Sequence, residues 1–143
     1  MKRVLIIDDQ RDNALILYER LSKEGYKVHI CYSGKDGIDY ALNEQPDLIL
    51  LDIMMPEMNG LEVCTFLTNN PKTSLIPIIM VTAKNTPQDT EEGFKAGALD
   101  YIKKPFDKLE LLARVRSAIQ HKETQELLLE AEKVSTYMAT VVT

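Results

Sequence analysis

Reactive polar residues follow several apolar runs of this sequence. Adjacent aspartates, Asp8 and Asp9, end the run VLII, and Asp52 ends the run LILL. Thr82 and Lys104 follow two later apolar runs. Crowded carboxylates need a cation or a proton to relieve their repulsion. Oxygen ligands without histidine suit Mg²⁺, which is usually completed by phosphate of a substrate. The residue types therefore predict a magnesium site with a hydroxyl and an ammonium beside it.

The elements that carry these residues alternate along the chain. Five short apolar or β-branched runs are the predicted strands, at residues 3–8, 27–31, 47–52, 77–83 and 99–102. Amphipathic stretches separate them, and this alternation predicts an α/β fold with a parallel sheet and right-handed crossovers. Ligands of such sheets bind outside the carboxyl ends of the strands. We therefore expect the reactive residues to lie along one edge of the sheet.

Capping signals mark the helices between these strands. The first helix should end at Gly25 and place Leu15, Tyr18 and Leu21 near one face. The predicted N-terminal caps of the later helices are Ser33, Asn59, Thr86 and Asp107.

The last part of the chain differs in character from about Gln120 onward. It has no strand or turn signal and continues the fifth helix. A 4-3-4-3 spacing there predicts a heptad seam made of Leu127, Ala131, Val134, Met138 and Val141. We expect residues 1–119 to form one domain and residues 120–143 a helical extension. The extension is interpreted as a coiled-coil connector to an effector, as a dimerising helix, or as a frayed helix packed on its own domain.

Composition excludes several classes of protein. A hydrophobic content of 45%, a charged content of 27% and a net charge of −5 indicate a globular domain without a nucleic-acid-binding surface. No apolar run reaches the length of a membrane span, and no signal peptide is expected. Cys31 and Cys64 lack disulfide or zinc spacing and are expected to be small buried thiols in the cytoplasm.

Four motifs together resemble the receiver domain of two-component response regulators. They are IIDD at 6–9, LLDIMMPEMNG at 50–60, VTA at 81–83 and YIKKPF at 101–106. The resemblance spans residues 3 to about 119. It implies a flavodoxin-like, doubly wound sheet of five parallel strands in the order 2-1-3-4-5 with five helices. It also implies a signalling protein, phosphorylated by a sensor histidine kinase or a phosphotransfer protein, that catalyses only its own phosphorylation and dephosphorylation.

The resemblance assigns a role to each residue at the predicted edge. Asp52 would be the phosphoacceptor, attacking a phosphohistidine or a small donor such as acetyl phosphate. Asp9 and Asp52 would hold Mg²⁺ directly, Asp8 mainly through water, and Met54 through its backbone carbonyl. Lys104 would neutralise phosphoryl oxygens in the transition state.

Further roles follow from the same resemblance. Thr82 and Tyr101 would form a switch in which the hydroxyl swings to the phosphate and the tyrosine turns from exposed to buried. This would change the face formed by the fourth helix, fifth strand and fifth helix, which is also a possible homodimer surface. The Lys104–Pro105 peptide bond would be cis, and Lys103 is the rival lysine, expected on the opposite face of the strand.

Three residues would govern access to the phosphate and its lifetime. Ala83 is small enough to admit it. Met54 offers no amide or carboxylate to orient an attacking water, and Lys84 could reach over the site. Slow self-dephosphorylation is therefore expected.

Two alternatives have specific sequence tests. An aspartyl-phosphate phosphohydrolase of the haloacid-dehalogenase type needs a DxD pattern after the first strand, whereas this chain has DDQ at 8–10. A receiver-like docking module that is never phosphorylated would lose an acid or the lysine, and this chain keeps them all.

Overall fold

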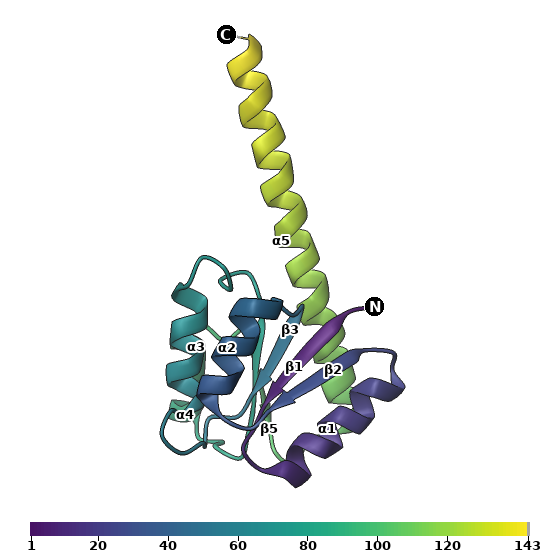
Figure 1. Ribbon diagram of the computed structural model, residues 1–143, viewed down its shortest axis with the longest axis vertical. Coiled ribbons are helices and arrows are strands. Elements are labelled where there is room, and N and C mark those ends of the chain that lie inside the picture. Colours follow the sequence, from purple (N-terminus) through teal and green to yellow (C-terminus); the bar gives the residue numbers. More distant parts are fainter. Residues whose placement is uncertain (143) are drawn as a thin grey trace.

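Five parallel strands form one sheet in the computed structural model, which describes the backbone of residues 1–142 and the side chains of residues 1–140. The strand order β2-β1-β3-β4-β5 confirms the order that the resemblance implies, and helices cover both faces of the sheet (Figure 1). The strands are β1 (Arg3–Ile7), β2 (Lys27–Cys31), β3 (Leu48–Leu51), β4 (Ile78–Thr82) and β5 (Asp100–Lys103). The helices are α1 (Arg11–Lys23), α2 (Gly34–Glu44), α3 (Gly60–Asn69), α4 (Pro87–Lys95) and α5 (Lys108–Val142). No helix within the described residues is long and apolar enough to cross a membrane.

The register of the sheet brings the predicted site residues to one edge. Ile7 of β1 pairs with Leu51 of β3, so the aspartates that follow these two residues emerge side by side. Farther along the same edge, Thr82 of β4 pairs with Lys103 of β5, the outermost strand. Side chains alternate between the faces of a strand, so this register also decides which residues face the helices.

Two apolar cores lie on opposite faces of the sheet. Leu5 and Ile7 of β1 belong to the core that also includes Val63 and Leu67 of α3. Val4 and Ile6 belong to the other core, which α1 and α5 cover. Strand β3 is buried along its whole length, as expected for a strand with helices on both faces.

The predicted caps are present at the helix ends. The side chains of Ser33, Asn59 and Thr86 each accept a hydrogen bond from the backbone N–H of the third helical residue. Gly25 has a φ of +90° just beyond α1, where its N–H donates to the carbonyl of Ser22. This positive φ explains why a glycine stands there.

Two local predictions were wrong. The buried face of α1 consists of Ala14, Leu17 and Leu21, while Leu15 and Tyr18 are exposed. Because α1 carries apolar residues around more than one face, helical spacing alone does not identify which face the sheet covers. Strand β5 is displaced by one residue from the predicted 99–102.

Helix α5 continues without a break far beyond the sheet. It is 35 residues long, and its C-terminal half projects from the domain (Figure 1). Lys122 Nζ lies 3.3 Å from Asp47 Oδ1, and Lys2 Nζ lies 3.1 Å from Glu123 Oε1. The helix therefore still contacts the domain at residues 122 and 123, just beyond the predicted boundary at residue 119. Val141, the last residue of the predicted seam, lies outside the residues whose side chains are described.

We predict that Gly60→Ala destabilises the protein by about 1–3 kcal/mol through overpacking. A Cβ at Gly60 would lie 2.2 Å from the carbonyl oxygen of Asp52 and 2.7 Å from Cα of Ile53, and neither backbone atom can yield easily. Gly25→Ala is the comparison, because a Cβ there meets nothing within 4 Å and only the positive φ costs free energy, about 1–2 kcal/mol. Urea unfolding of both variants measures the difference. Wild-type stability in Gly60→Ala would contradict the packing argument.

Candidate functional site

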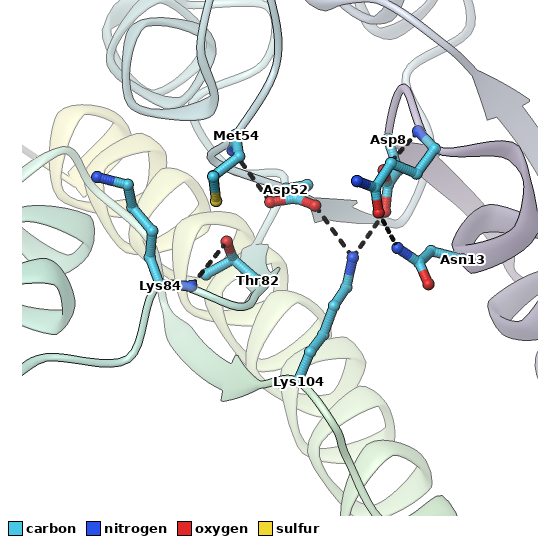
Figure 2. A network of polar contacts seen from close by, with 8 residues as sticks. Asp8, Asn13, Asp52, Met54, Thr82, Lys84 and Lys104 are labelled. Carbon is cyan, nitrogen blue, oxygen red and sulfur yellow. Dashed lines mark hydrogen bonds and ion pairs between the residues drawn. The ribbon is translucent and has the colours of Figure 1, made fainter.

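The carboxyl edge of the sheet brings Asp8, Asp52, Thr82 and Lys104 together. Figure 2 shows the Lys104 side chain reaching between Asp8 and Asp52. Asp8 and Asp52 follow the paired ends of β1 and β3, and Lys104 follows β5. Its backbone N–H donates to the carbonyl of Thr82, which extends the β4–β5 pairing by one residue. Sheet pairing therefore places all four residues.

Lys104 bridges two buried carboxylates. Its Nζ lies 2.9 Å from Asp8 Oδ2 and 3.0 Å from Asp52 Oδ2, and its side chain is only 14% exposed. Burial, the largest influence, favours the neutral amine, but the hydrogen bonds and charges of the two aspartates outweigh it and raise the pKa of Lys104. The ammonium form is thus held between the two acids, where it neutralises part of their charge.

Asp8 is the more deeply buried of these two acids. Its Oδ1 accepts a hydrogen bond of 2.9 Å from the backbone N–H of Gln10. Burial raises the pKa of Asp8 above its ordinary value, in spite of this hydrogen bond and of Lys104. One lysine therefore does not fully compensate the cost of keeping this carboxylate charged.

Asp52 is oriented by the loop that follows β3. Its Oδ1 accepts a hydrogen bond of 3.0 Å from the backbone N–H of Met54, while Oδ2 contacts Lys104. The loop closes on itself through the N–H of Gly60, which donates to the carbonyl of Ile53. The carboxylate is buried, so groups within this edge, rather than bulk water, determine its surroundings.

Asp9 has a buried oxygen without a partner among the described residues. Its Oδ1 makes no hydrogen bond, although a buried carboxylate oxygen is costly to leave unpaired. Among residues 1–140, no three or more His, Cys, Asp or Glu side chains are arranged to hold a metal by themselves. A hard cation here would need backbone carbonyl and water ligands as well, which is how Mg²⁺ is commonly bound. The orphaned oxygen and the all-oxygen donors fit such an ion.

The end of β4 forms another side of the site. Thr82 is fully buried and its Oγ1 accepts a long hydrogen bond of 3.4 Å from the N–H of Lys84. Figure 2 shows the Thr82 hydroxyl pointing toward Asp52 and Met54. Ala83 and Lys84 are exposed, and Lys84 Nζ lies 3.9 Å from Asp89 of α4. The Lys84 ammonium is thus directed to α4.

Tyr101 occupies a buried position behind this loop. Its side chain is 7% exposed, and its hydroxyl donates a 2.6 Å hydrogen bond to the carbonyl of Lys84. Gly93 makes room for the ring, because a Cβ there would lie 2.9 Å from it. Burial, with the charges of nearby acids, raises the pKa of Tyr101 to about 12. The Tyr101 ring therefore already lies in the buried orientation that we expect of the phosphorylated form, and not in the exposed orientation from which the predicted switch would start.

The residues next to Lys104 and next to Asp9 complete this edge of the sheet. The Lys104–Pro105 bond is cis, and Lys103, the rival lysine, is exposed. The sequence did not identify Gln10 or Asn13, whose side chains are hydrogen-bonded to each other beside Asp8. The available signal was the position of Gln10 directly after the two aspartates and of Asn13 in the first turn of the helix that follows.

Comparison with protein families and curated proteins gives a consistent result. The family model described as "Response regulator receiver domain" matches residues 4–116. Response regulator ArlR of Staphylococcus saprophyticus is 43% identical over 128 residues, which cover 90% of this chain and 57% of that protein. ArlR of Staphylococcus aureus is 41% identical over 128 residues, with the same coverage. The chain thus spans little more than half the length of these curated relatives.

Solved structures with the same fold are also similar in sequence. A CheY-like response regulator receiver domain protein from Methanospirillum hungatei is 30% identical with a TM-score of 0.81, over 87% of this chain and 98% of that chain. The chemotaxis protein CheY4 of Vibrio cholerae is 28% identical with a TM-score of 0.78, over 82% and 98% of the two chains. The residues matched by the family model, 4–116, include Asp8, Asp9, Asp52, Thr82 and Lys104.

We predict that Lys104→Met lowers the free energy of unfolding by about 3 kcal/mol, because it leaves buried carboxylates without their shared cation. Lys103→Met is the matched control. Its side chain is exposed one residue away, so its effect should stay within about 0.5 kcal/mol. Denaturant unfolding at neutral pH compares the two variants. Equal stabilities would show that the bridge seen between Asp8 and Asp52 contributes nothing to the fold.

Proposed function

The chain belongs to the response regulator receiver-domain family, and from this premise we propose that it is the phosphoacceptor of a cytoplasmic His-Asp phosphorelay, with Asp52 as the acceptor. The observation that carries the proposal is the Lys104 ammonium held 3.0 Å from Asp52 and 2.9 Å from Asp8. A lysine positioned against the acceptor carboxylate is also positioned against a phosphoryl group bound to it. The donor would be a sensor histidine kinase or a phosphotransfer protein.

The chemistry is a displacement at phosphorus. An oxygen of Asp52 forms a bond to the phosphorus as the bond from phosphorus to the donor's histidine nitrogen breaks, and the histidine keeps that electron pair. Negative charge on the phosphoryl oxygens must be stabilised at the same time. Lys104 supplies a fixed positive charge for this purpose, and the N–H of Met54 orients the acceptor carboxylate.

The acidic residues would hold the magnesium ion. Asp9 and Asp52 would bind it directly, Asp8 through water, and Met54 through its backbone carbonyl. When bound, Mg²⁺ supplies additional neutralisation of phosphoryl charge. The unpartnered oxygen of Asp9 and the raised pKa of Asp8 support this assignment, because both reflect carboxylate charge that the protein leaves uncompensated.

Thr82 and Tyr101 would convert phosphorylation into a change of surface. The Thr82 hydroxyl has only a weak hydrogen bond to exchange for one to a phosphoryl oxygen. Tyr101 lies between this loop and α4, so its position is sensitive to where the loop lies. The face of α4, β5 and α5 would then differ between the phosphorylated and unphosphorylated forms and control an effector. The competing function is a docking module that is never phosphorylated.

We predict that beryllofluoride with Mg²⁺ produces a saturable change in tyrosine fluorescence of the wild-type protein, because it mimics phosphate on the acceptor and moves the surroundings of Tyr101. Asp52→Asn should abolish the response. Asp39→Asn, which removes an exposed acid on α2, should retain it. A response that persists in Asp52→Asn would exclude Asp52 as the acceptor, and no response in wild type would favour the docking module.

We also predict that the phosphorylated protein persists for minutes or longer and that Met54→Asn shortens its lifetime several-fold. Met54 is exposed beside the acceptor and cannot orient an attacking water, whereas an amide can. The protein is loaded with acetyl phosphate and Mg²⁺, and decay is followed after the donor is removed. Met54→Leu controls for side-chain loss and should decay like wild type. Equal decay in Met54→Asn would remove this role from Met54.

A further inference from the structure

The solvent-facing side of α5 carries an unbroken line of uncharged residues. Its first half lies where the helix covers the sheet and consists of Ala113, Ser117, Gln120 and Thr124, all exposed. They continue backward the 4-3 spacing of the seam predicted for the extension, so they occupy heptad positions a and d. The inward side of the same turns is buried or bound to the domain, as at Val115, Ala118 and Lys122.

The second half of this line is apolar. Leu127, Val134 and Met138 are 71%, 60% and 53% exposed, and Ala131 lies between them. The change from polar to apolar occurs where the helix leaves the domain. At 3.6 residues per turn, the line lies on the opposite side of the helix from Val115, Ala118 and Lys122. It therefore points away from the chain's own domain, which cannot cover it.

We propose that a second copy of this chain covers this line, and that two α5 helices pair in parallel and in register from Ala113 to Met138. Parallel pairing places each a or d residue opposite its own copy, so that apolar residues meet apolar ones and polar residues meet polar ones. Antiparallel pairing over the same length would place the apolar half against the polar half. The two domains then lie on the outside of the helix pair, because each occupies the side of α5 that faces away from the line.

The residues beside the line support this choice of partner. In a parallel pair, a residue at heptad position g lies near the e residue of the partner helix five positions later. Glu123 then lies near Leu128 and Glu130 near Ser135, so no acidic residues are brought together. Leu128 and Tyr137, themselves 58% and 67% exposed, widen the apolar surface on its two sides. This interface goes further than the dimerising helix considered for residues 120–143, because it also includes the part of α5 that covers the sheet.

Disulfide mapping in the full chain tests the proposal and needs no phosphorylation, so its outcome is separate from the role of Asp52. Ser117→Cys, Thr124→Cys and Ala131→Cys place thiols on the line, whereas Glu132→Cys and Thr136→Cys place them on other sides of the helix. The native Cys31 and Cys64 are buried, with thiol pKa values raised to about 11 and 12, so they contribute little background.

The expected result is covalent dimer at all three line positions, formed several-fold faster than at the two control positions. Cross-linking at Ala131→Cys alone would confine pairing to the extension and overturn the continuous interface. Rates equal to those of the controls would overturn the pairing altogether.

Mass in solution provides a second measurement. Wild type should have twice the mass of the monomer, and Val134→Lys should lose this doubling. Leu129→Lys adds the same charge to an exposed leucine away from the line and should remain dimeric. A monomeric wild type, or disruption by Leu129→Lys but not by Val134→Lys, would contradict the proposal.

Discussion

The charge balance at the carboxyl edge of the sheet is the constraint on which the site depends. Burying carboxylates is costly unless they are paired, and here one lysine is shared by Asp8 and Asp52 while Asp9 retains an unpartnered oxygen. The apolar strands beneath must hold these groups in place against their repulsion. The remaining negative charge makes this edge electrostatically suited to a cation.

The register of the sheet places the side chains of Asp8, Asp52 and Lys104 close together at its carboxyl edge. Ile7 pairs with Leu51, and Thr82 pairs with Lys103, so the residues that follow come out of the sheet at matching levels. If one strand slipped by one residue relative to its neighbour, the side chains on that strand would turn to the opposite face of the sheet. The aspartates and the lysine would then no longer meet. The tight loop after β3, closed by Gly60 against Ile53, then aims the Asp52 carboxylate by a hydrogen bond from Met54.

Helix α5 links this edge to surfaces far from it. It begins shortly after Lys104, covers one face of the sheet, and is anchored at the other edge by the contact of Lys122 with Asp47. The first half of α5 is thus packed against the sheet, while the second half lies beyond it. The C-terminal half exposes apolar side chains that the chain's own domain does not cover, among them Leu127, Val134 and Met138.

The sequence by itself determined the elements, most of their caps and which polar residues follow the strands at the carboxyl edge. Local signals carry these features: apolar runs, Ser33, Asn59 and Thr86 before helices, and acids directly after strands. Strand order came from the family resemblance, because no pattern within one strand encodes its neighbours. Only the tertiary structure decided that α1 buries Ala14 and Leu17 instead of Leu15, that Lys104 bridges Asp8 and Asp52, and that Asp47 anchors α5 through Lys122. These features depend on contacts between residues distant in the chain, whose distances and burial follow from packing and not from spacing.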